Sequence, residues 1–195
     1  MDNKKNAGTR FFIGSAQFFI LLIIAEAVYP NYSVSANYIS DLGVWGKTSA
    51  IIFNPSIIFM SLLNLTGTYY VQKEFKTCTF SSFLALTGLG SLLVGFFPED
   101  TILVNGVPLV HSIGALMAFI FGGIAAITAY RITKSPFRHF SVVLGAASLL
   151  ALMLFFTTAS AGYLGLGVGG MERMITYPAQ IWTLSFGAYL MAPQN

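Results

Sequence analysis

The sequence predicts an all-α membrane protein, a polytopic bundle of six transmembrane helices with both termini in the cytoplasm. Of its 195 residues, 55% are hydrophobic and only 9% are charged, whereas a soluble domain carries about a quarter charged residues. The apolar residues form six runs, each near the ~20 residues that a helix needs to cross a bilayer. Backbone polar groups must be paired in lipid, and a membrane barrel would show short alternating strands, so these runs predict helices.

The six helices account for most of the chain. We expect residues 1–195 to form a single integral membrane domain, because the connectors are too short to hold a second one. The predicted helices span residues 10–29, 48–71, 80–97, 107–130, 140–162 and 172–192.

The first predicted helix, 10–29, begins at Arg10, and the apolar run that follows contains one charged residue, Glu26, about one turn from its end. An unpaired carboxylate there would cost a few kcal/mol, so Glu26 requires a partner. Arg173 is the leading candidate, because it is one of only two basic residues expected on that side of the membrane. Glu172 and Asp41 compete for the same arginine.

Helices 48–71 and 172–192 each carry a polar face at the helical spacing, which predicts that these faces look into the bundle. Polar residues of this kind also commonly serve only as hydrogen-bonding contacts between helices. The two faces comprise Asn54, Ser61, Asn64 and Thr68 in the first, and Glu172, Thr176, Gln180, Thr183 and Gly187 in the second.

Helices 80–97 and 140–162 are apolar runs that follow basic connectors. Helix 107–130, between them, places His111, Ala115, Ala118 and Gly122 on one face. Small residues let a neighbouring backbone come close, so this face predicts a tight helix contact beneath the histidine.

Basic residues are distributed unequally between the two sets of connectors, which predicts the orientation. Eight of ten fall on one side, leaving Lys47 and Arg173 on the other. The positive-inside rule places the eight, and both termini, in the cytoplasm of a cell-membrane protein. Because these residues are dispersed, no nucleic-acid partner is implied. The eight are Lys4, Lys5, Arg10, Lys73, Lys76, Arg131, Lys134 and Arg138.

The outer side collects most of the acidic residues, and we interpret them as a candidate ligand-binding cluster. One interpretation is a headgroup or small-ligand site, and the other is a buried ion-pair knot that locks the outer loops. The candidate residues are Glu26, Asp41, Glu99, Asp100, His111, Glu172 and Arg173.

No motif assigns a reaction to this cluster, so catalytic residues and enzymatic activity stay open. A carboxyl group and His111 could act as acid and base on a lipid ester, but metalloprotease and nucleophile-elbow motifs are absent. The spacing gives no reason to expect a metal or cofactor. The glycine-rich segment 165–170 has no preceding strand and is interpreted as a flexible entry into the last helix. The aromatic residues Tyr29, Tyr32, Tyr38, Trp45 and Tyr163 are expected in an interfacial belt.

Several short segments, in this order, resemble a known membrane family, domain of unknown function 998. The resemblance covers nearly the whole chain and implies a six-helix bundle with these segments on one face, without an established activity. The loop around Ile39, Ser40 and Asp41 also resembles the first outer loop of DRAM and Frag-type membrane proteins, which are linked to lipid remodelling and autophagy. The segments are Tyr29-Pro30, Asn37 to Gly43, Gly95 to Asp100, His111-Ser112 and Gly170 to Arg173.

Together these observations favour a membrane protein that binds or modifies a lipid or a small polar ligand at the outer mouth of the bundle. The alternative is a non-catalytic accessory subunit of a membrane complex. Membrane lipids and other membrane protein subunits are therefore the expected partners.

Overall fold

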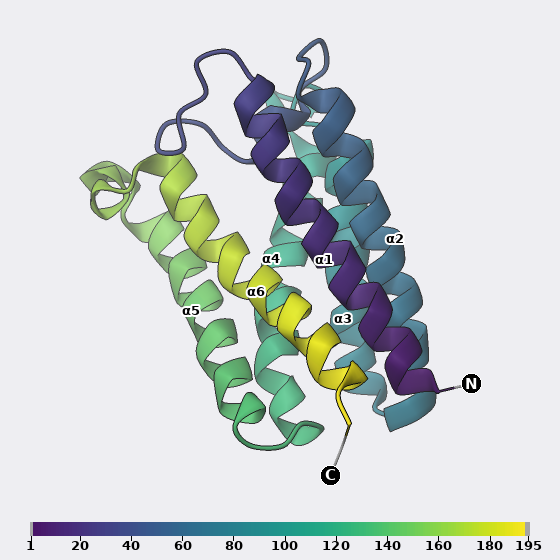
Figure 1. Cartoon of the computed structure of the whole chain (residues 1–195). Coiled ribbons are helices and arrows are strands. Elements are labelled where there is room, and N and C mark those ends of the chain that lie inside the picture. Colours follow the sequence, from purple (N-terminus) through teal and green to yellow (C-terminus); the bar gives the residue numbers. More distant parts are fainter. Residues whose placement is uncertain (1, 194–195) are drawn as a thin grey trace.

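A computed structural model describes residues 2–193, which form six α-helices, three short 3-10 segments and one two-stranded hairpin (Figure 1). The predicted all-α class is confirmed. The helices are α1 Asn3–Val28, α2 Ala50–Phe75, α3 Cys78–Phe96, α4 Leu109–Thr128, α5 Phe137–Thr157 and α6 Gly167–Met191. The other elements are the 3-10 segments η1 Ser40–Gly43, η2 Ala129–Arg131 and η3 Ala159–Gly165, and the strands β1 Leu103–Val104 and β2 Val107–Pro108.

Five of the described helices, α1 to α5, are long and apolar enough to cross a membrane. The chain is therefore a multi-pass membrane protein. Helix α6 has 25 residues but is not among these candidates, because its polar face lowers its hydropathy. A sixth crossing by α6 stays a prediction.

Several helices extend beyond the predicted limits. Helix α1 begins at Asn3 rather than at residue 10, because Asp2 accepts a hydrogen bond from the Lys5 N–H at 3.3 Å and caps the helix. Helix α2 continues to Phe75, and α6 begins at Gly167 rather than at residue 172. Hydropathy marks the apolar part of a helix, whereas polar and basic residues can prolong the helix into the interface.

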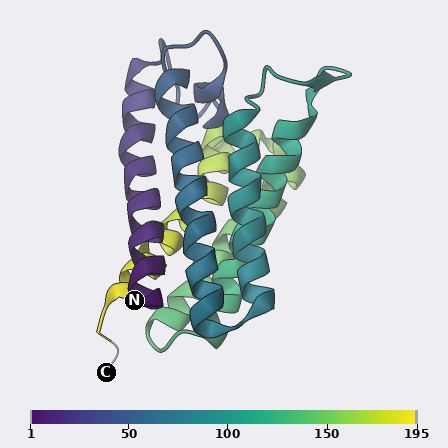
Figure 2. The ribbon, with the colours of Figure 1, turned by 90° about the vertical axis from the view of Figure 1, so that its right-hand side faces the viewer.

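The six helices form a closed ring. Each helix packs against the next one along the chain, and α6 returns to pack against α1. Figure 2 shows α1 to α4 side by side with the hairpin projecting beyond them. The backbones of α1 and α6 approach most closely at Gly8 and Gly187, where a Cβ built on Gly187 would lie 2.6 Å from the Phe12 nitrogen.

The two ends of the bundle differ in their charge. The terminal end carries both termini and the connectors that follow α2 and α4, whereas the loop end carries residues 29–49, 97–108 and 158–166 (Figure 1). The eight basic residues listed above lie at or near the terminal end, and Lys47 and Arg173 lie at the loop end. The basic residues, which are unequally divided between the two sets of connectors, are therefore concentrated at one end of the bundle.

The small-residue face of α4 makes the predicted tight contact only in part: a Cβ on Gly90 of α3 would lie 2.6 Å from the Ala118 nitrogen. His111, Ala115, Ala118 and Gly122 line a cavity inside the ring. The close approach is made by the neighbouring Gly114, whose added Cβ would lie 2.8 Å from the carbonyl oxygen of Gly90 on α3. Only one edge of the predicted face is thus in the contact, because small residues suit a cavity wall as well as a helix contact. By contrast, the polar faces of α2 and α6 point inward as predicted.

Candidate functional site

An arginine knot, formed by Glu26, Tyr32 and Arg173, ties α1, the following loop and α6 together at the loop end. The Nη2 of Arg173 donates to Glu26 Oε1 and to the Tyr32 hydroxyl oxygen, both at 2.6 Å. Its Nη1 donates to the carbonyl oxygens of Val34 and Gly169 at 3.0 and 2.9 Å. The Arg173 side chain is only 6% exposed. The predicted Glu26–Arg173 pair is confirmed, and Tyr32 is a further member of this knot.

The loop at residues 30–39 packs directly on the first turn of α6. The Gly169 N–H donates to the Ser35 carbonyl oxygen at 2.9 Å, and a Cβ on Gly169 would overlap the Asn37 carbonyl. Within the glycine-rich segment, Gly167 and Gly169 therefore pack closely on this loop, whereas a Cβ on Gly165 would meet no atom within 4 Å. The flexibility expected at this entry into α6 stays a prediction. Glycine is needed here so that two backbones can touch.

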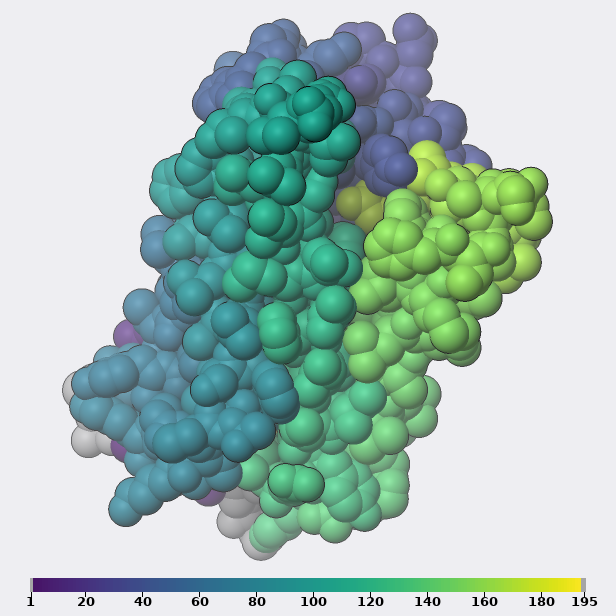
Figure 3. Space-filling model, turned by 180° about the vertical axis from the view of Figure 1, so that it is seen from behind, coloured from purple at the N-terminus to yellow at the C-terminus, as the bar shows by residue number. Residues whose placement is uncertain are grey.

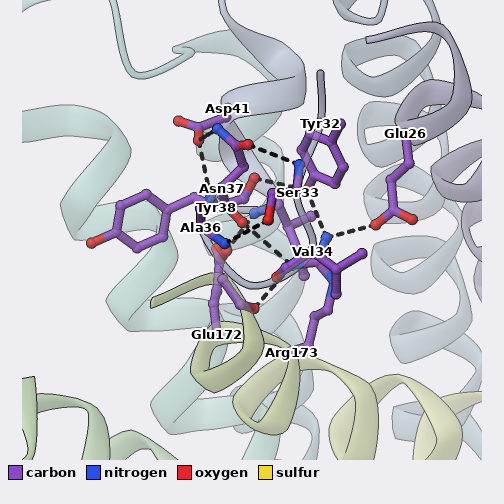
Figure 4. A network of polar contacts seen from close by, with 12 residues as sticks. Glu26, Tyr32, Ser33, Val34, Ala36, Asn37, Tyr38, Asp41, Glu172 and Arg173 are labelled. Carbon is purple, nitrogen blue, oxygen red and sulfur yellow. Dashed lines mark hydrogen bonds and ion pairs between the residues drawn. The ribbon is translucent and has the colours of Figure 1, made fainter. Parts of the chain in front are cut away.

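The far side of the same loop presents acidic groups. Asp41 accepts hydrogen bonds from the Asn37 side-chain amide and from the Tyr38 N–H, both at 3.0 Å. Glu172, next to Arg173 in sequence, accepts one from the Ile39 N–H. Figure 4 shows Tyr38 and Glu172 on one side of the network and Glu26 on the opposite side. Glu172 and Arg173 are adjacent on α6, yet they belong to two separate groups of polar contacts.

The second group, which we name the acid–histidine cluster, consists of Ser40, Glu99, His111 and Glu172. The Ser40 hydroxyl donates to Glu99, and His111 Nε2 lies 3.6 Å from Glu99 Oε1. His111 Nδ1 lies 3.0 Å from the Phe97 carbonyl oxygen. That oxygen can only accept, so Nδ1 carries the proton and Nε2 of the neutral ring is an acceptor.

The protonation of Glu99 is set by its surroundings. Burial raises the pKa of Glu99 to about 7, Asp41 and Asp100 act in the same direction, and the Ser40 hydrogen bond opposes them. Burial also raises the pKa of Tyr38 to about 12, so its hydroxyl stays neutral. The cluster can therefore exchange a proton near neutral pH.

Stability should fall with rising pH because of Glu99. The folded protein holds its proton between the ordinary pKa of 4.5 and about 7, while the unfolded chain has lost it, so the free energy of unfolding decreases across this window. Each pKa unit corresponds to about 1.4 kcal/mol, which limits the loss to roughly 3 kcal/mol. Thermal unfolding of detergent-solubilised protein at pH 4.5–8 should show a weaker decline for Glu99→Gln than for wild type. Glu74→Gln, a control at the terminal end, should retain the wild-type decline, and an equal decline in Glu99→Gln would contradict this assignment.

The cluster lies at the polar end of a groove of about 430 Å³ that is bordered by α4, α5 and α6. Figure 3 shows the surface hollowed between α4 in teal and α5 in green. Tyr38 and Ser112 add hydroxyl groups to the polar end. The rest of the wall is apolar and is lined by Leu116, Phe119, Leu152, Phe155, Phe156 and Ile175.

A smaller cavity of about 80 Å³ continues from the cluster into the centre of the ring. Groove and cavity share Ser40, His111 and Glu172 as lining residues. The cavity also receives the polar faces of α2 and α6 through Asn64 and Gln180.

The structure places the seven candidate residues in different parts of the loop end. Glu99, His111 and Glu172 line the groove, and Glu26 and Arg173 form the knot. Asp41 stabilises the loop between them, and Asp100, which accepts a hydrogen bond from the Trp45 N–H at 3.1 Å, is exposed and lines neither space.

Sequence reasoning missed Ser40 and Tyr32 as members of these groups, and it missed Tyr38 as a lining residue of the groove. A signal was present, since Ser40 and Tyr38 fall in the segment Asn37 to Gly43, one of those that carry the family resemblance. Within residues 2–193, no three acidic, histidine or cysteine side chains are arranged to hold a metal ion. The cluster can accept hydrogen bonds from an occupant through the carboxyl groups of Glu99 and Glu172 and through His111 Nε2.

These features define a helical multi-pass membrane protein with a polar cluster at one end of the bundle. The chain belongs to the family described as "Protein of unknown function (DUF998)", whose model matches residues 12–189. The match runs from α1 to α6. No curated protein and no solved structure matches the chain. The likeness to DRAM and Frag-type proteins stays a prediction.

Proposed function

We propose that this protein binds an amphipathic lipid, with the polar head at the acid–histidine cluster and the chain in the groove between α4 and α5. The observation that carries the proposal is the groove itself, which is polar at one end and apolar along the rest. This division matches a molecule with a polar head and a hydrocarbon chain. Its volume is within the range of about 300–1,000 Å³ that small-molecule sites usually have.

A lipid can reach this groove from the side. The loop at residues 29–49 covers the loop end of the bundle (Figure 1), whereas the groove edges are exposed on the bilayer-facing surface, with Leu116 at 42% and Phe156 at 67%. A hydrocarbon chain can therefore enter from the bilayer without leaving an apolar environment. The polar head of the lipid would then contact the acid–histidine cluster near the first turn of α4.

Filling the groove tests this proposal. Ala115 lines the groove beside the cluster, so Ala115→Trp should displace the bound lipid while the ring still forms. Ala146→Trp places the same side chain on the exposed face of α5 and is the matched control. Lipid that remains with the purified protein should fall for Ala115→Trp only, measured by mass spectrometry of extracts after extensive detergent washing. Equal retention by both variants would favour a non-catalytic accessory subunit.

We further propose that the loop end faces the outside of the cell membrane and that both termini are cytoplasmic. The distribution of basic residues between the two ends supports this orientation. In a Cys78→Ser background, a cysteine at exposed Ser35 should react with an impermeant maleimide in intact cells. A cysteine at exposed Lys134 should react only after permeabilisation. The reverse pattern would place the cluster on the cytoplasmic side.

A further inference from the structure

The walls of the groove and the cavity present hydrogen-bond acceptors. Glu99 and Glu172 contribute carboxyl groups, and the neutral ring of His111 contributes Nε2. The Ser40 hydroxyl already donates to Glu99, and the Thr183 hydroxyl donates to a backbone carbonyl of its own helix. An occupant of the groove therefore meets two carboxyl groups, together with the hydroxyl groups of Tyr38 and Ser112, which can donate as well as accept.

Among the described residues, no lysine or arginine joins these acids in the walls. Within the described residues, neither space is lined by a lysine or arginine. The Nη atoms of Arg173 are directed to the arginine knot, and Lys47 lies 4.9 Å from the centre of the Tyr29 ring. The other eight basic residues lie at or near the terminal end. The charge that would neutralise the cluster must come from an occupant, or else the acids must take up protons.

Asn64 provides an independent observation from another helix. Its side chain, on α2, lines the central cavity and is only 7% exposed. Among residues 2–193, no donor reaches its Oδ1, and the same is true of the buried Gln180 Oε1. Both residues line the central cavity, so a hydrogen-bond donor placed there would satisfy these acceptors.

We propose that the lipid head carries an ammonium group and no anionic group. This inference rests on the proposed lipid site and specifies its ligand class. An ammonium has three donors and no acceptor, and its positive charge pairs with ionised Glu172 and Glu99. A phosphate or carboxylate would instead place a second negative charge beside two carboxyl groups. No bond is made or broken in this binding step.

Oleylamine, oleyl alcohol and oleic acid test the inference, because they share one chain and differ only in the head. Each is added to the purified protein in neutral detergent at pH 8, and the mole fraction that gives half of the maximal rise in melting temperature is measured. We expect the amine to act at a mole fraction at least about tenfold lower than the alcohol, a difference of 1.4 kcal/mol. We expect no rise with the acid.

Variants test whether the preference for the amine over the alcohol depends on the acid–histidine cluster. Glu172→Gln keeps an acceptor for the Ile39 N–H but removes the charge, so the advantage of the amine over the alcohol should fall about tenfold or more. Asp100→Asn removes a loop-end carboxylate outside the groove and should keep the wild-type advantage. If Glu172→Gln does not fold, Glu99→Gln serves in its place.

The possible failures are distinguishable. If the acid or the alcohol acts as strongly as the amine, and Ala115→Trp abolishes both effects, the lipid site stands and the ammonium inference is wrong. If none of the three compounds changes the melting temperature, the lipid site itself is contradicted. If Asp100→Asn loses the amine preference as fully as Glu172→Gln does, the preference comes from the general charge of the loop end rather than from the groove.

Discussion

Replacing Arg173 with alanine should lower the free energy of unfolding by about 3–5 kcal/mol, the cost expected when one partner of a buried ion pair is removed. The change would leave the Glu26 carboxylate, 20% exposed, without its charged partner. It would also remove the donors to Tyr32 and to the Val34 carbonyl that hold the loop on α6. Thermal unfolding of the detergent-solubilised protein measures the loss.

A double variant distinguishes the loss of the Glu26–Arg173 ion pair from a general loss of side-chain packing as the cause of the destabilisation. Glu26→Gln combined with Arg173→Met removes both charges, so its stability should exceed that of Arg173→Ala. Arg131→Ala, at an exposed arginine of the terminal end, should change stability little. Losses that simply add in a Glu26 and Arg173 mutant cycle would show that the two residues are not coupled.

Gly187→Ala should destabilise the ring by about 1–3 kcal/mol, the usual cost of overpacking. The added methyl group would lie 2.6 Å from the Phe12 nitrogen and 2.7 Å from the Gly8 carbonyl oxygen. These are backbone atoms, so α1 and α6 must move apart to accommodate it. The same thermal unfolding experiment measures the effect.

Gly122→Ala is the matched control, because Gly122 is also buried in a helix. A Cβ there meets no atom closer than 3.5 Å, since the position faces the central cavity. Alanine is favoured over glycine in a helix by about 1 kcal/mol, so Gly122→Ala should be neutral or stabilising. Equal losses for both variants would mean that the α1–α6 contact is not unusually close.

The Glu26–Arg173 pair was predictable from the sequence because one strong physical cost required it. A carboxylate inside an apolar run needs a partner, and the loop end offered only two basic residues. The division of the acidic residues was not predictable in this way. Glu172 and Arg173 are adjacent in sequence, yet they point to different groups, and the direction of each depends on how residues 30–39 pack against α6.

The helices themselves were predictable from hydropathy, because the bilayer permits few other structures. Their ends were not, since the cap at Asp2 depends on local hydrogen bonding rather than on hydropathy. The partly correct prediction for α4 has a similar origin. The sequence shows which residues are small, whereas the packing of α3 decides that Gly114 makes the contact and Gly122 lines the cavity.

Photo-crosslinking with a long-chain lipid that carries a diazirine in its chain tests the central claim, that the groove between α4 and α5 binds lipid. Mass spectrometry should locate the main crosslinks at Leu116 and Phe119 on α4 and at Leu152 and Phe155 on α5, and excess unlabelled lipid should abolish them. The exposed outer face at Ile51, 76% exposed, should give weaker labelling that competitor reduces only in proportion to dilution. The lipid site in the groove would be contradicted if labelling simply followed side-chain exposure and if the competitor reduced it no more in the groove than at Ile51.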